Sequence, residues 1–202
     1  MNIAKTAVAA VAAGAALLAG CSTSDDGHDM GAMGTTTAPP SATPTAVAGE
    51  HNDADISFAQ DMIPHHAQAI EMAELVDGRT TTPAVVGLAE RVEKAQDPEI
   101  RTMTGWLTAW GAEVPESGGH GGHDSMPGMM SGEDMDRLAE AQGGAFDRLW
   151  LEMMIEHHEG AIEMARTELA EGANPGAKEL AQQIIDGQQA EITEMKALLN
   201  KA

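Results

Sequence analysis

The apolar residues after residue 54 fall into stripes with a helical period. The first stripe advances by alternating steps of four and three residues and contains Phe58, Met62, His65, Ala69, Met72 and Val76. After a short polar interval, a second stripe contains Val85, Leu88, Val92, Glu99, Met103 and Leu107. This period is typical of α-helices that bury one face. Residues 55–107 are therefore predicted to form a hairpin of two helices.

The same hairpin occurs a second time. When residues 55–107 are shifted by 92 positions, they align without a gap on residues 147–199, and 18 of the 53 positions are identical. Thr82-Pro83 and Asn174-Pro175 occupy equivalent places, where the first residue can cap a helix and proline suits the first helical position. Two hairpins predict an all-α fold, a single four-helix bundle built from two repeats.

Two helix boundaries follow from the same pattern. The first helix is expected over residues 55–77, and its counterpart over residues 133–171. Pro64 lies inside the first helix, whereas the equivalent residue of the second repeat is Glu156. A proline removes one helical hydrogen bond and crowds the carbonyl four residues earlier, here that of Gln60. The first helix is therefore predicted either to kink near Gln60 or to start there.

The segments outside the repeats have a different composition. Residues 1–20 contain Lys5 followed by a short apolar run, and "LAGC" ends at Cys21, which resembles the signal peptide and lipobox of a bacterial lipoprotein. This resemblance implies lipidation at Cys21, such as palmitate, and a location on the outer face of the cytoplasmic membrane. A short membrane anchor or a buried helix is the alternative. Residues 21–52 are predicted to be a disordered tether, residues 53–202 the bundle, and residues 111–134 a linker between repeats.

The charge and the cysteine content narrow the possible partners. The formal net charge is -21, which repels nucleic-acid phosphates and anionic lipid and attracts cations. Nucleic acid is therefore not expected as a partner. Cys21 is the single cysteine, so the chain cannot form an internal disulfide or a thiolate metal cluster.

Half of the eight histidines occur as two adjacent pairs in similar surroundings, "MIPHHAQAIEMA" at 62–73 and "MIEHHEGAIEMA" at 154–165. His65 and His157 lie on the buried stripes, and His66 and His158 lie beside them. The polar residues expected near these imidazoles are Gln96, Glu99, Gln188 and Glu191. Buried polar groups need partners, and a metal ion would supply them, with the glutamates orienting the imidazoles. The alternative is that each histidine is a core residue hydrogen-bonded to Glu99 or Glu191.

Methionines surround both pairs. Met62, Met72, Met154 and Met164 are thioether candidates, although each of them could instead fill the core. Two Gly-rich stretches carry further histidines and methionines where no core is expected: His28, Met30, Met33, His120, His123, Met126, Met129 and Met130. Thioethers and imidazoles together favour copper, with Cu(I) preferred and Cu(II) possible. The alternative for these stretches is a low-complexity linker with incidental methionine.

The doubled His-His motifs, each followed by a helix of the form "LA…Q…EI…M", resemble the bacterial DUF305 family over residues 53–199. This resemblance implies a ferritin-like four-helix bundle in a secreted or lipid-anchored protein, with copper binding in some members. A ferritin-like di-iron oxidase would need Glu-x-x-His motifs, and no histidine in the sequence has a glutamate three residues before it. The chain is therefore predicted not to be an enzyme.

The hypothesis from sequence is an extracytoplasmic copper-binding lipoprotein that buffers copper or exchanges it with a donor or acceptor protein. A cell-surface adhesion or assembly module that binds no metal is the rival hypothesis. The oligomeric state does not follow from the sequence. The equal position of the two pairs within their repeats also predicts a shared site, in which an imidazole nitrogen of one pair lies within about 8 Å of one from the other.

Overall fold

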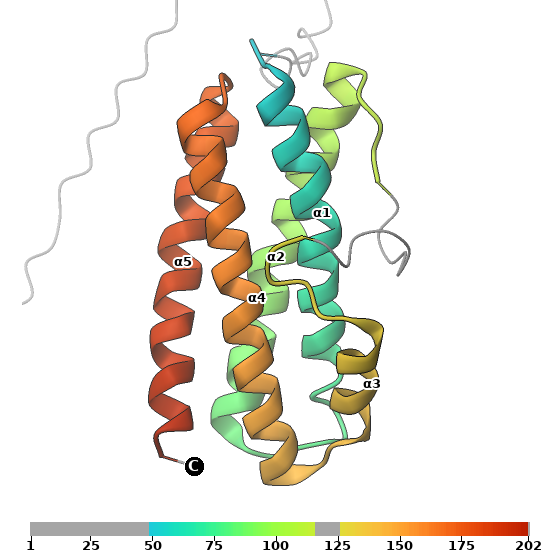
Figure 1. Ribbon diagram of the computed structural model, residues 1–202, viewed down its shortest axis with the longest axis vertical. Helices are drawn as coiled ribbons and strands as arrows, with labels where there is room; N and C mark the ends of the chain where they lie inside the picture. The colour runs from blue at the N-terminus through green and yellow to red at the C-terminus, as the bar shows by residue number, and fades with distance from the viewer. Residues whose placement is uncertain (1–48, 116–125, 202) are drawn as a thin grey trace, which may run out of the picture. The chain divides into compact units, whose positions relative to one another are not determined.

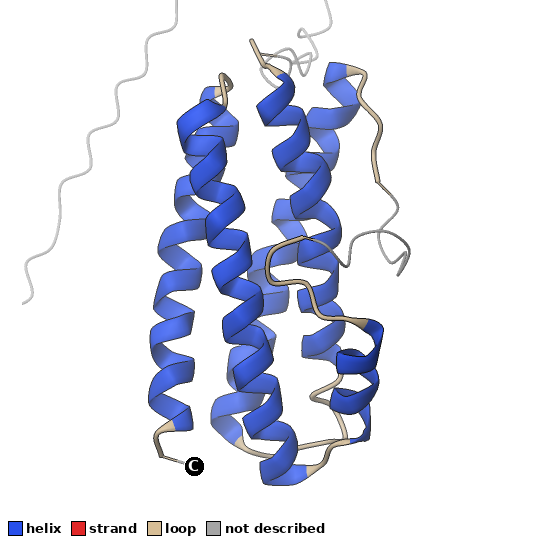
Figure 2. Cartoon of the chain, in the orientation of Figure 1, coloured by secondary structure: helices blue, strands red, loops and turns tan. Residues whose placement is uncertain are grey.

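The computed structural model describes residues 49–115 and 126–201, and all regular secondary structure in these residues is helical. The helices in chain order are α1 (Asp53–Glu74), α2 (Pro83–Trp110), α3 (Gly132–Glu140), α4 (Gly143–Glu171) and α5 (Pro175–Leu199). The long helices α1, α2, α4 and α5 form a bundle, and the short helix α3 lies beside it (Figures 1 and 2). The all-α prediction is confirmed. None of these helices is long and apolar enough to span a membrane.

The two predicted hairpins pack against each other through their first helices. α1 packs along α2, and α4 packs along α5, while α1 and α4 form the main contact between the hairpins. α2 and α5 touch at few places. Because α1 and α4 run in opposite directions (Figure 1), equivalent residues near their midpoints lie at the same level of the bundle.

Equivalent aspartates tie each hairpin to the turn of the other. The carboxylate of Asp55 in α1 accepts hydrogen bonds from the backbone N–H groups of Ala173 and Asn174, the latter at 2.8 Å. Asp147 in α4 accepts a hydrogen bond of 2.6 Å from the hydroxyl of Thr82. Asn174 also caps α5 as predicted, because its side chain accepts from two backbone N–H groups there. Thr82 forms no such cap on α2, and its hydroxyl donates to Asp147 instead.

Two predicted helix boundaries are wrong. α1 begins at Asp53 and continues through Pro64, so the predicted start at Gln60 is wrong, while the alternative of a kink near Gln60 stays a prediction. Its first turn is held by a capping box between Asn52 and Asp55, which stabilises a start well before the proline. The helix expected over residues 133–171 is two helices, because the chain is extended at Ala141 and Gln142. Gly143 then adopts φ +55°, which favours glycine, and donates its N–H to the Arg79 carbonyl at 2.8 Å.

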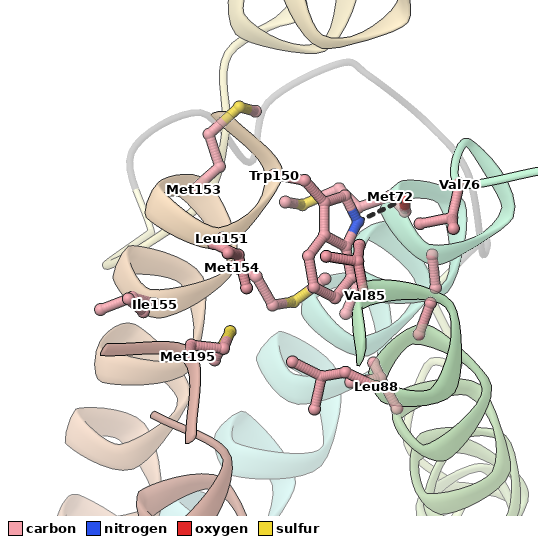
Figure 3. Close-up of a cluster of buried hydrophobic side chains, with 14 of the residues drawn as sticks. Met72, Val76, Val85, Leu88, Trp150, Leu151, Met153, Met154, Ile155 and Met195 are labelled. Atoms are coloured by element: carbon pink, nitrogen blue, oxygen red, sulfur yellow. Dashed lines mark hydrogen bonds between the residues drawn. The ribbon is translucent and has the colours of Figure 1, made fainter. Parts of the chain in front are cut away.

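The core consists of two apolar clusters with polar residues between them. The Trp150 cluster lies where α1 ends and α4 begins, and includes Met72, Val85, Leu88, Trp150 and Met195 (Figure 3). Within it, the indole N–H of Trp150 donates to the Met72 carbonyl at 2.8 Å. The Phe58 cluster occupies the other end and includes Phe58, Met62, Met103, Leu107 and Ile184. On both α1 and α4, the histidine pair lies between the residues of the two clusters.

Candidate metal site

The four histidines of the two pairs form one buried layer at the middle of the bundle. All four are 0% exposed. The rings of His65 and His157 face each other across α1 and α4, with centroids 3.8 Å apart and planes inclined by 39°. Ring nitrogens lie only about 1 Å from their centroid, so the predicted 8 Å approach of the two pairs is confirmed. The approximate two-fold relation between the repeats therefore converts two separate motifs into one cluster.

The outer histidines are held by carboxylates on the second helix of each hairpin. His66 Nε2 donates to Glu99 Oε2 at 2.7 Å, and His158 Nε2 donates to Glu191 Oε2 at 2.8 Å. The predicted contact of these glutamates with imidazoles is thus present, and it involves the outer histidine of each pair. An imidazole that carries its proton on Nε2 has a free lone pair on Nδ1. Both outer rings therefore offer Nδ1 as a ligand atom.

The inner histidines have fewer partners. His65 Nε2 donates to the carbonyl oxygen of Pro127 at 3.0 Å. Neither ring nitrogen of His157 makes a hydrogen bond of normal geometry within the described chain, and the Nδ1 atoms of His65, His66 and His158 also have none there. Buried polar atoms without partners are rare in folded proteins, and each calls for an explanation such as a functional role, a bound ion or a buried water. Here five of them belong to one layer of imidazoles.

Burial keeps the inner pair uncharged. It lowers the pKa of His65 to about 3, assisted by the neighbouring imidazole of His66. Burial likewise holds the pKa of His157 well below its ordinary value, and the imidazoles of His65 and His158 act in the same direction. Both inner histidines are therefore neutral at physiological pH. Neutral imidazole is the form that binds metal ions.

A segment of the linker between the repeats covers this layer. Residues 126–130, here called the strap, pass over α1 and α4 (Figure 1, yellow). The Gln68 side chain donates to the Met130 carbonyl at 2.9 Å and accepts from the Met130 N–H at 2.8 Å. The strap approaches α4 so closely that a Cβ on Gly128 would lie 2.7 Å from the Glu156 carbonyl oxygen, and one on Gly160 would collide with the Pro127 carbonyl.

Sequence reasoning missed the strap. A signal was available, because Gln68 and Gly160 are equivalent positions of the two repeats that differ sharply in chemistry. One position supplies a side chain that binds the strap, and the other supplies the space that the strap needs. The strap therefore crosses the approximate two-fold axis of the bundle directly over His65 and His157.

The proposed methionine ligands lie at different distances from the imidazoles. Met62 and Met154 are fully buried and precede the inner histidines by three residues, which is about 4.5 Å along the helix axis. Met72 and Met164 follow the inner histidines by seven residues, which is about 10 Å. Met72 packs in the Trp150 cluster, and Met164 lines a separate cavity together with Glu168. By axial position alone, Met62 and Met154 therefore lie closer to the level of the layer than Met72 and Met164. Met62 packs in the Phe58 cluster, and Met154 packs in the Trp150 cluster with Met72.

The linker residues are only partly described. Met130 is 4% exposed and packs in the Trp150 cluster, so the interpretation that it has no core to fill is wrong. Met126 and Met129 are half-buried on the strap. The other proposed residues of these stretches, and the predicted lipidation site, lie outside the described residues: Cys21, His28, Met30, Met33, His120 and His123.

The donor atoms limit the metals that the layer suits. Within residues 49–115 and 126–201, no three His, Cys, Asp or Glu side chains are grouped so that they alone could hold a metal ion. A metal ion in the layer would therefore be held by imidazole nitrogen together with other donors. The thioethers of Met62 and Met154 are candidates because each lies three residues before an inner histidine on the same helix. Imidazole with thioether suits a soft ion such as Cu(I). Gln96 and Gln188 lie farther out, lining a small cavity between α2 and α5 with Glu99 and Glu191.

Solved structures of similar chains share this fold. A DUF305 fragment from Deinococcus radiodurans is 30% identical, with a TM-score of 0.69, and the match covers 76% of this chain and 100% of that one. A candidate secreted DUF305 protein from Streptomyces coelicolor is 33% identical, with a TM-score of 0.67, over 73% and 93% of the two chains. CopM in its Cu(II)-bound form is 36% identical, with a TM-score of 0.64, over 73% and 96%. CopM structures with Cu(I) and with Ag bound also match.

The family assignment rests on a match along most of the bundle. No curated protein matches the chain. The model of the family described as "Domain of unknown function (DUF305)" matches residues 55–199, which include both repeats and the linker between them. The four histidines of the buried layer all lie inside this match. The chain belongs to the DUF305 family.

Proposed function

We propose that this protein is an extracytoplasmic copper-binding lipoprotein, anchored through Cys21, that buffers copper or hands it on and catalyses no reaction. The observation that carries the proposal is the layer of four buried imidazoles with five unpartnered ring nitrogens. The copper-bound and silver-bound structures of CopM, a protein 31–36% identical to this chain, support the choice of metal. The S. coelicolor relative supports a location outside the cytoplasm.

The hydrogen bonds indicate which atoms would bind copper. His65, His66 and His158 each use Nε2 as a donor to an oxygen, so their ligand atom is Nδ1. His157 has no hydrogen bond of normal geometry on either nitrogen within the described chain, and either tautomer of the neutral ring would offer one lone pair. Met62 and Met154 are the thioether candidates beside the layer, and Met126 and Met129 of the strap are auxiliary candidates. Such a donor set favours Cu(I) and also accommodates Cu(II) through the imidazoles.

The cost of the layer to stability supports a functional role. A buried polar atom left without a partner costs about 1–3 kcal/mol. Leucine in place of a buried histidine would remove that cost and fill a similar volume. Proteins retain such destabilising groups where function needs them. Replacement of His157 by leucine should therefore stabilise the metal-free protein and remove one copper ligand.

The substitution His157→Leu tests this directly. We expect the metal-free variant to be at least as stable as the wild type in urea unfolding. Its affinity for Cu(I), measured anaerobically against a competing chelator, is expected to fall. The matched control is His51→Leu, because His51 stacks on Trp110 outside the layer, with ring centroids 4.7 Å apart. This control is expected to leave the affinity unchanged.

Two results would reject the proposal. If His157→Leu destabilises the metal-free protein and leaves copper affinity unchanged, His157 is a core residue and the layer is structural. If the wild type binds Cu(I) no more tightly than a peptide of residues 120–130, the bundle contributes no site. The second result would leave a metal-free adhesion or assembly module as the remaining function.

A further inference from the structure

The strap covers one side of the histidine layer, and the opposite side has a different construction. There α2 and α5 touch at few places and enclose a small cavity of about 50 Å³. Its walls include Gln96 and Glu99 from α2, and Gln188 and Glu191 from α5. These are equivalent residues of the two repeats, separated by 92 positions. This cavity, here called the seam, therefore lies near the approximate two-fold axis, on the side of the bundle away from the strap.

The polar groups of the seam are unusually unsatisfied. Gln96 is 2% exposed, and neither its amide nitrogen nor its amide oxygen has a hydrogen-bond partner in the described part of the chain. Gln188 is 5% exposed, and its amide oxygen likewise has none there. Buried amides without protein partners are rare unless they face water or an ion. A water molecule needs about 10–15 Å³ of space measured in this way, so the seam has room for a few water molecules or for a small, partly hydrated cation.

The glutamates of the seam connect solvent with the imidazoles. The side chains of Glu99 and Glu191 are 21% and 18% exposed. Each also accepts the Nε2–H of an outer histidine that is fully buried. A cation held by these carboxylates is therefore one contact away from the layer. Carboxylate and amide oxygens suit Cu(II), which also accepts imidazole nitrogen.

The strap side offers a less direct path. The carbonyl oxygen of Pro127 occupies His65 Nε2, and the backbone of Gly128 rests against the backbone of α4. Two hydrogen bonds from Gln68 hold Met130 in place. Passage on that side would require these contacts to break, whereas the seam is already hollow and lined with oxygen atoms.

We infer that the seam is the port through which the copper ion enters and leaves the histidine layer, with Glu99, Glu191, Gln96 and Gln188 as transient oxygen ligands. The inference rests on the proposed function. Two carboxylates at an opening in a chain of net charge -21 raise the local cation concentration, which speeds entry. The port therefore controls the rates of uptake and release, while the imidazoles control the affinity.

The substitution Gly187→Leu tests the port. Gly187 is an exposed residue of α5 at the wall of the seam, and a Cβ built there meets no atom of the described chain within 4 Å. Leucine favours helix over glycine, so the variant is expected to fold, and its side chain would obstruct the opening. The matched control is Gly105→Leu, because Gly105 is an exposed mid-helix glycine of α2 with the same open surroundings. Ala95→Leu obstructs the seam from the opposite wall.

The rates are measured by stopped flow, with copper supplied as Cu(II), the oxidation state that the seam oxygens suit, in a complex with a coloured chelator. We expect Gly187→Leu and Ala95→Leu to slow uptake and release several-fold with an unchanged equilibrium affinity, and Gly105→Leu to match the wild type. Gln68→Ala, which loosens the strap, is expected to leave both rates unchanged. The port is rejected if both seam variants keep the rates of the control, or if Gln68→Ala alone accelerates exchange. Absence of tight binding in the wild type would instead reject the proposed function, and the port with it.

Discussion

The strap makes Gly160 a sensitive position. Gly160 is buried in the middle of α4, and a Cβ added there would collide with the carbonyl oxygen of Pro127. The backbone of a helix in the centre of the bundle cannot move without disturbing both apolar clusters. We therefore predict that Gly160→Ala forces the strap away from α4 while the four long helices remain folded.

The size of the effect follows from the contacts of the strap. Lifting it breaks the two Gln68–Met130 hydrogen bonds and the bond from His65 to Pro127, at about 1 kcal/mol each. Partial exposure of Met130 costs about a further 1 kcal/mol. Alanine improves helix propensity over glycine by about 1 kcal/mol. The expected net loss in the free energy of unfolding is therefore about 3 kcal/mol.

Gly105→Ala is the matched control. Gly105 also lies within a helix, five residues before the end of α2, and a Cβ there meets no atom of the described residues within 4 Å. This variant is expected to gain up to about 1 kcal/mol from helix propensity alone. Urea unfolding followed by far-UV circular dichroism compares the two variants under identical conditions. If Gly160→Ala is as stable as Gly105→Ala, the strap does not pack on α4 as described, and the reasoning fails.

Three further predictions concern stability. As the pH falls below about 6.5, the unfolded chain binds protons at His65 and His157 that the folded protein excludes. The free energy of unfolding should therefore fall by about 1.4 kcal/mol per pH unit for each histidine. Urea titrations should show a shallower decline for His157→Leu than for the wild type. Burial and the neighbouring Asp55 raise the pKa of Glu168 to about 8. The folded protein therefore keeps a proton there that the unfolded chain releases above about 4.5, so this group lowers stability as the pH rises from 4.5 to 8. Because the two histidines act in the opposite direction below about 6.5, the net decline should show between pH 6.5 and 8. A wild-type decline over that interval equal to that of Glu168→Gln would contradict this. Trp150→Phe removes the hydrogen bond to the Met72 carbonyl and should lower the free energy of unfolding by about 1–2 kcal/mol, and with it the melting temperature. An unchanged melting temperature would show that water replaces the indole N–H.

The sequence by itself determined the helices and their pairing. Helical period, turn residues and an ungapped internal repeat are local properties, so residues 55–107 and 147–199 could be assigned to two hairpins without knowledge of the tertiary structure. The repeat also predicted that the two histidine pairs would meet, because equivalent residues on antiparallel helices lie at one level. The contacts of Glu99 and Glu191 with imidazoles could likewise be predicted, since both glutamates lie on the buried stripes or at their edges.

Only the tertiary structure decided which atoms face the site. The path of the strap depends on a backbone approach at Gly160 and a side-chain clamp at Gln68, and neither has a periodic signature. Met130 looked like a loop residue because burial by a distant part of the chain leaves no local pattern. Met72 and Met164 share the helical face of the histidines, but their distance along the axis separates them from the layer. Periodicity identifies a buried face, whereas a binding site depends on which side chains converge, and that is set by contacts between residues far apart in sequence.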